Sequence, residues 1–150
     1  MLEKREWGDY VQMTNDRLKH SLSVAKKMKE IVEGKTKMYS FNPDEAFILG
    51  MLHDIGYEFC ETQEEHAHRG GEVLKEQGYK FWKEIYFHGV PQEEYSSAEL
   101  WLLNYVDMIT SPNGEYISIQ ARIEDIETRY GKDSLQVEEA RKLAKMLERI

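Results

Sequence analysis

Histidine and aspartate residues recur along the sequence at positions that should face a protein interior. They lie among apolar residues at helical spacing, and a titratable side chain is costly to bury there unless a partner or a metal ion holds it. Imidazole and carboxylate groups are ligands that divalent transition metals accept in proteins. The pattern therefore predicts a metal site. The candidate ligands are His20, His53, Asp54, His66, His88 and Asp107.

A packing explanation competes with this prediction for each residue taken alone, since a lone histidine on an apolar face is usually a hydrogen-bonded core residue. Six such residues are hard to explain in that way, because each would need its own buried partner. His68 provides a contrast within the sequence. It lies two positions after His66, about 200° around a helix axis, and we expect it to face solvent.

The elements that must position these residues are helices, because apolar residues repeat with helical spacing nearly everywhere and no strict alternation supports a sheet. We predict an all-α fold, a single-domain bundle of about six or seven helices over residues 1–150. A chain of 150 residues is long enough to bury one core. The expected helices span residues 15–33, 43–52, 62–78, 79–88, 96–109, 118–130 and 134–150, and the pattern allows a short helical turn before residue 15.

Residues with capping chemistry indicate where several of these helices begin. Asn42 precedes a proline and two acidic residues, a sequence typical of a helix N-terminus. Thr62 with Glu65, and Ser96 with Glu99, have the spacing of capping boxes. The helix after Asn42 is apolar almost all round, so we expect it to be the buried central helix of the bundle.

Composition restricts the classes of partner and ligand. A net charge of -8 argues against binding of extended nucleic acid, which usually needs a basic face, whereas bound cations would still attract a small anionic substrate. Cys60 is the lone cysteine, so any metal must be bound by nitrogen and oxygen. No apolar run is long enough to span a membrane and the first residues lack a signal-peptide pattern, so a cytoplasmic location without membrane contact is expected.

The order of the candidate ligands resembles a known family signature. His20, then His53-Asp54, then Asp107 is similar to the H...HD...D motif of the HD superfamily of metal-dependent phosphohydrolases. The segment 49–56, LGMLHDIG, looks like the family's apolar helix that leads into its histidine-aspartate pair. The resemblance implies an all-helical phosphohydrolase domain.

Further segments resemble particular groups within this superfamily. Residues 66–74, HAHRGGEVL, resemble the H-x-x-x-G-x-x-L stretch of the subgroup that binds two metals, and His88 falls where that subgroup has its next histidine. Residues 122–131 look like the tail of small stand-alone HD proteins. Tyr57 replaces the lysine of the HD-GYP cyclic dinucleotide phosphodiesterases, and Gly89 follows His88 where those enzymes have a second histidine, so a cyclic dinucleotide is a poor substrate candidate. The ligand order is closer to that of bacterial HD-type hydrolases of diadenosine tetraphosphate, although the segment after His88 differs from theirs.

The resemblance also implies a metal centre and a reaction. The ligands suit one or two divalent transition-metal ions, with Fe or Mn expected and Zn, Co, Ni or Mg as alternatives. A hydroxide between two ions would attack phosphorus, with His53 and Asp54 as the central catalytic residues. One ion would be held by His20, His53, Asp54 and Asp107, and a second by His66 and His88 with Asp54 as the bridge.

Two arginines are candidates for binding the substrate. Arg17 and Arg69 each lie three residues from a candidate ligand on nearby helix faces, so either could hold a phosphate, although an ordinary solvated charge is the alternative for both. The implied function is hydrolysis of a nucleotide, a dinucleotide or another small phosphate ester or anhydride. Two alternatives stay open, a nucleotide-sensing domain that does not hydrolyse and a di-iron oxygenase of the HD type.

Overall fold

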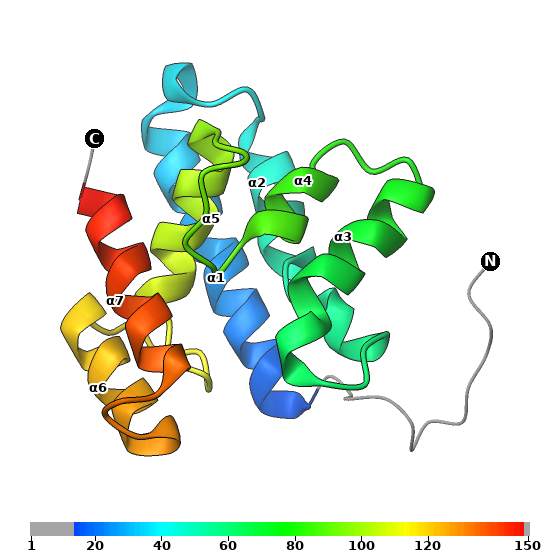
Figure 1. Cartoon of the computed structure of the whole chain (residues 1–150). Helices are drawn as coiled ribbons and strands as arrows, with labels where there is room; N and C mark the ends of the chain where they lie inside the picture. Colours follow the sequence, from blue (N-terminus) through cyan, green and yellow to red (C-terminus); the bar gives the residue numbers. More distant parts are fainter. Residues whose placement is uncertain (1–13, 149–150) are drawn as a thin grey trace.

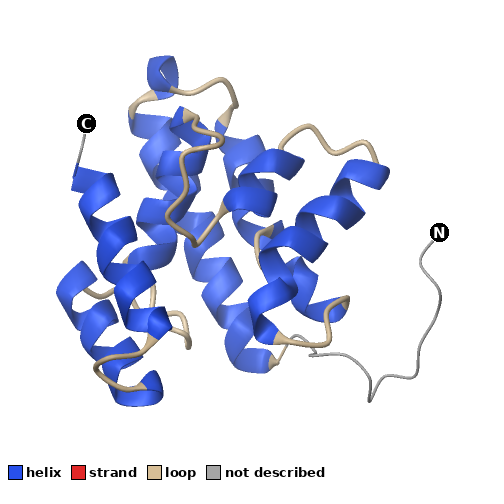
Figure 2. Ribbon diagram, in the orientation of Figure 1, coloured by secondary structure: helices blue, strands red, loops and turns tan. Residues whose placement is uncertain are grey.

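Helices make up almost all of the regular structure in residues 14–148, the part of the chain that this computed structural model describes (Figure 1 and Figure 2). Within this range there are seven α-helices, and no strand apart from an isolated bridge between Thr110 and Tyr116. The all-α prediction is confirmed. Short 3-10 turns lie at Thr36–Met38, Ile55–Glu58 and Gln63–Glu65. The helices are α1 (Asn15–Gly34), α2 (Pro43–Leu52), α3 (His66–Glu76), α4 (Trp82–Phe87), α5 (Ala98–Met108), α6 (Ile119–Tyr130) and α7 (Leu135–Glu148).

Side-chain caps begin α2 and α5 near the predicted positions. The Asn42 side chain accepts a hydrogen bond from the Glu45 amide at 2.8 Å, and the Glu45 carboxylate accepts one from the Asn42 amide at 3.0 Å, which completes the predicted capping box. The cap of α5 is Ser97 and not Ser96. Because the backbone is extended at Ser97, its hydroxyl reaches the first turn and accepts from the Leu100 amide at 2.9 Å.

Two helices are shorter than the sequence predicts. No side-chain cap forms at Thr62, and the chain makes the 3-10 turn Gln63–Glu65 instead, so α3 begins at His66. The fourth helix spans Trp82–Phe87 and not residues 79–88, because the backbone of His88 is extended and leaves the helix. Two predictions fall outside the described residues. They are the helical turn before residue 15, where it concerns residues 1–13, and the end of the last helix at residues 149–150.

The main core lies between α1, α2, α4 and α5, where Met28, Leu49 and Leu102 are 0% exposed. α2 was expected to be buried all round, but it leaves Ile48 48% exposed because it packs chiefly on α1. The contact between these two helices is close at Gly50, where an added Cβ would lie 2.5 Å from the Cα atom of Ala25 in α1. This approach brings the end of α2 beside α1, and both helices carry candidate ligands.

α6 and α7 pack against α5 on the side of the molecule away from α3 and α4 (Figure 1). Met108, Ile123 and Leu143 belong to this second apolar cluster, and the Trp101 indole donates to the Leu147 carbonyl oxygen at 3.2 Å. The pair of helices therefore has a fixed place beside α5. Among residues 14–148, no helix combines the length and the apolar character that a membrane crossing needs.

Candidate metal centre

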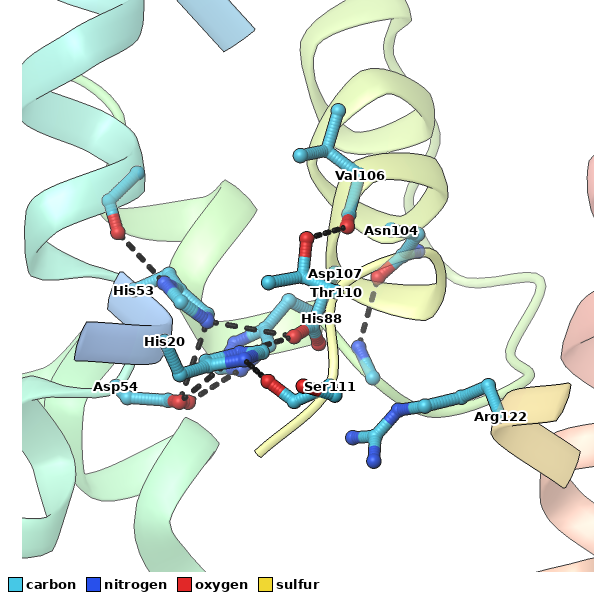
Figure 3. A network of polar contacts seen from close by, with 12 residues as sticks. His20, His53, Asp54, His88, Asn104, Val106, Asp107, Thr110, Ser111 and Arg122 are labelled. Atoms are coloured by element: carbon cyan, nitrogen blue, oxygen red, sulfur yellow. Dashed lines mark hydrogen bonds and ion pairs between the residues drawn. The ribbon is translucent and has the colours of Figure 1, made fainter. Parts of the chain in front are cut away.

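Four imidazole rings are oriented toward one centre by hydrogen bonds on their Nδ1 atoms, and Figure 3 shows three of them, the rings of His20, His53 and His88. A backbone carbonyl oxygen can only accept, so each of these Nδ1 atoms carries the proton and each Nε2 atom presents a lone pair when the ring is neutral. Metal-binding histidines are typically oriented in this way. The four pairs are His20 with Ser111 O at 2.9 Å, His53 with Gly50 O at 2.6 Å, His66 with Gln63 O at 2.8 Å, and His88 with Ile85 O at 2.6 Å.

The Asp54 carboxylate lies between two pairs of these rings. Its Oδ2 atom is 3.2 Å from His53 Nε2 and 3.8 Å from His20 Nε2. Its Oδ1 atom is 3.2 Å from His66 Nε2 and 3.3 Å from His88 Nε2. One carboxylate therefore faces both pairs, with one oxygen directed to each, which is the arrangement of a bridging ligand.

Asp107, from the last turn of α5, lies beside the rings of His20 and His53. Its Oδ1 atom is 2.8 Å from His20 Nε2 and 3.5 Å from His53 Nε2. The His53 Nε2 atom is fully buried and has no hydrogen-bond partner within residues 14–148, although two carboxylates lie beside it. A buried ring nitrogen in that position needs a proton or a cation. The donor set therefore fits a metal ion.

Electrostatic effects within the cluster are strong because the groups are buried. Burial alone would raise the pKa of the Asp54 carboxyl, but the adjacent imidazoles, above all His53, hold this pKa well below its ordinary value. The pKa of Asp107 is also held well below its ordinary value, by His20 and His53. Burial would lower the pKa of His53, but Asp54 and Asp107 raise it well above 6.5, and Asp54 raises the pKa of His66. Without metal the site therefore retains protons, which a cation would replace.

A cavity of about 350 Å³ opens beside this cluster. Its walls include His20, Asp54, His66, His88 and Asp107 on one side, and residues of α6 and α7 on the other. The volume is near the lower end of the range for small-molecule sites, roughly 300 to 1,000 Å³. The cavity can therefore enclose one small organic molecule next to the candidate ligand atoms.

The two arginines suggested by the sequence have different places. Arg17 lines the cavity, with its guanidinium 4.1 Å from the centre of the Tyr57 ring. Arg69 does not line the cavity, and its guanidinium instead contacts the Phe59 carbonyl oxygen at 3.4 Å and the Glu72 carboxylate at 3.3 Å. Of the two, only Arg17 is placed to meet a ligand.

His68 lies apart from the cluster, as its position in the helix predicts. Its side chain is exposed, and its ring stacks on Tyr86 with 4.3 Å between the ring centres. The ring does not line the cavity. The helical spacing that selects His66 therefore separates the two histidines correctly.

Two residues beside the cavity were not identified from the sequence as parts of the site. Tyr57 stacks on His66 with 4.3 Å between ring centres and 3° between ring planes, and so supports the ring of a candidate ligand. Arg122, in the first turn of α6, lines the cavity wall that faces the cluster. The signal for Arg122 was its spacing from Ile126 and Arg129, since residues four and seven positions apart share one helix face.

Fold and site together define an all-helical domain with a buried histidine-aspartate centre that could hold metal. A family model described as "HD domain" matches residues 17–126. The match spans more than half of the chain, and the chain therefore belongs to the HD domain family, whose members are generally metal-dependent phosphohydrolases. The resemblance read from the sequence is confirmed. Comparisons with curated proteins and with solved structures give no match.

Proposed function

We propose that this protein is a metal-dependent hydrolase of a small phosphate ester or anhydride, with a nucleotide as the expected substrate. The observation that carries the proposal is the position of Asp54 between two pairs of anchored imidazoles, next to a cavity of substrate size. Membership of the HD domain family supports the reaction class.

The residues divide between two ion positions. One ion, here called the second, would be held by His66 and His88 together with Asp54. The Oδ2 atom of Asp54 faces the first position, beside His20 and His53. Nitrogen and oxygen donors suit Fe or Mn, with Zn, Co, Ni or Mg as alternatives. When bound, such ions supply Lewis-acid activation of water and of the phosphoryl oxygens. The first ion would be held by His20, His53, Asp54 and Asp107.

The protein's own groups supply position and charge. Nδ1 hydrogen bonds fix the tautomer of His53 and hold its Nε2 atom beside the Asp54 carboxylate, so the central pair is preorganised. Arg17, held over Tyr57 at the cavity wall, can contact an anionic substrate. Because the pair of His53 and Asp54 is buried, charges there interact more strongly than they would in water.

Metal analysis combined with a panel of phosphate substrates tests the proposal. Full-length protein loaded with Mn²⁺ or Fe²⁺ should hydrolyse at least one nucleotide or simple phosphate ester. Asp54→Asn should lower turnover by at least about 100-fold and reduce bound metal, because it removes the bridging carboxylate. Asp44→Asn is the matched control, since Asp44 is an exposed aspartate in α2 that pairs with Lys29.

Two outcomes would count against hydrolysis, and a third would count against the proposed site. Metal-loaded protein that binds nucleotides without turnover would indicate a sensor. A mixed-valent iron signal with oxygen consumption would indicate an oxygenase. Parent-like turnover in Asp54→Asn would remove the basis of the proposed site.

A further inference from the structure

Arg122 is a partly buried cation whose hydrogen-bonding capacity is only partly used. Its Nε atom is fully buried and has no hydrogen-bond partner in the described part of the chain. The nearest carboxylate contact, from Nη1 to Asp125 Oδ2, is long at 3.8 Å. The side chain is 19% exposed, so the rest of the guanidinium remains accessible at the cavity that the residue lines. A partly buried charge with few hydrogen-bond partners is stabilised by an incoming anion.

The Asp125 carboxylate is not available to Arg122 alone, because it also pairs with Arg129. The distance from Arg129 Nε to Asp125 Oδ2 is 3.2 Å, shorter than the contact to Arg122. Two guanidinium groups thus share one carboxylate. Arg122 and Arg129 both line the cavity, as does the carboxylate residue Glu139 of α7.

The face of α6 that carries Arg122 is also the face that lines the cavity. Arg122, Ile126, Arg129 and Tyr130 all line it, at the spacing of one helix face. The Arg122 guanidinium points from α6 toward the part of the site where His88 and Asp107 lie (Figure 3). An anion in the cavity would therefore have the metal ligands on one side and this guanidinium on the other.

We propose that Arg122 is a substrate-binding residue whose guanidinium holds the phosphate of the substrate. The inference rests on the proposed function and deepens it. A guanidinium edge presents two parallel N–H donors, a geometry that matches two oxygens of a phosphate. Arg17 contacts the same cavity from α1, so the phosphate would be held from two sides.

Inorganic phosphate is the probe, titrated calorimetrically into full-length protein loaded with Mn²⁺. Arg122→Gln should raise the dissociation constant for phosphate by at least about 10-fold, because a charge-assisted hydrogen bond is lost. It should also raise KM for the substrate found active in the panel. Arg122→Lys keeps the charge without the two-donor edge, and should give an intermediate dissociation constant.

Arg141→Gln is the matched control. Arg141 lies on α7 beside α6 and pairs with Glu127, but it does not line the cavity. Its substitution makes the same change in charge on the same helix pair, and phosphate binding should stay within about twofold of the parent. Metal content and melting temperature of each variant show that the fold and the ion positions are intact, and Arg122→Lys serves if Arg122→Gln does not fold.

The outcomes separate the two proposals. Unchanged phosphate affinity and KM in both Arg122 variants, in a parent protein that hydrolyses phosphate esters, would overturn the role of Arg122 and leave the proposed function standing. A metal-loaded parent that neither binds phosphate nor hydrolyses any substrate would overturn both. A rise in the dissociation constant for Arg122→Gln alone, with Arg141→Gln unchanged, supports the proposal.

Discussion

Metal removal should lower the thermal stability of the protein by an amount that grows with pH. The raised pKa values of His53 and His66 stabilise the metal-free fold when these rings are protonated. This contribution is fully present below the ordinary value of 6.5 and is lost as pH rises through the folded-state values. The lowered pKa values of Asp54 and Asp107 stabilise the fold above their ordinary value of 3.8, and that contribution is lost only as pH falls through still lower values. Between these limits, metal must displace the histidine protons in order to bind.

The size of the effect follows from the number of displaced protons. Each proton changes the metal affinity tenfold per pH unit, about 1.4 kcal/mol, so displacement of one or two gives about 1.4 to 2.7 kcal/mol per pH unit. For a domain of this length 1 kcal/mol corresponds to about 2–4 °C in melting temperature. The difference in melting temperature between metal-loaded and metal-free protein should therefore grow by about 3 to 11 °C per pH unit.

Thermal unfolding of both forms, followed by circular dichroism at fixed free Mn²⁺ from about pH 5.5 to about pH 8, measures this difference across the titration range of histidine. His68→Gln should leave the slope unchanged, because His68 is exposed and outside the cluster. His53→Gln should reduce it. A difference that is constant across this range, or larger at acidic pH, would refute the reasoning.

Three further predictions concern the residues that hold the site together. Gly56→Ala should destabilise the fold by about 1–3 kcal/mol, because its Cβ would lie 1.7 Å from the His66 carbonyl oxygen; denaturant unfolding checks this, and Gly34→Ala, where no atom lies within 4 Å, should cost no stability. His66→Ala and His88→Ala should each retain the ion at the first position and lose most turnover; one ion per chain in fully active parent protein would contradict this. Tyr57→Phe should keep the stack on His66 and parent-like metal content, whereas Tyr57→Ala should lower the occupancy of the second position, as measured by metal analysis; equal metal content in the two variants would exclude a supporting role for the ring.

Helical spacing was sufficient to identify the rings that meet at the centre, but not the arginines that accompany them. Arg17 and Arg69 are equivalent in sequence, each three residues from a histidine. They differ in the structure because Arg69 contacts the Phe59 carbonyl oxygen and the Glu72 carboxylate, whereas Arg17 lies over the Tyr57 ring at the cavity. These are contacts with particular neighbours, which apolar periodicity does not reveal.

Arg122 was missed for a different reason. In the sequence it sits beside Ile123 on an amphipathic helix, where an arginine is usually a solvated charge. Its position at the cavity depends on how α6 packs against α5 and α7, a tertiary contact that involves the buried residues Met108 and Leu143. The pattern of one helix does not contain that information. The stack of Tyr57 on His66 is likewise a contact between two segments, and spacing within either segment does not predict it.

The four imidazoles differ in how far along the chain the carbonyl group that orients each ring lies. His53, His66 and His88 each bind the carbonyl oxygen three residues earlier, so a segment of four residues is enough to set each ring. His20 is different, because its partner, Ser111, is 91 residues away in the turn after α5. Movement of that turn would release one ring and leave the other three in place. As a candidate ligand, His20 would thus link occupancy of the proposed first ion position to the docking of distant parts of the chain, and its ring NMR signals would report whether that docking is complete.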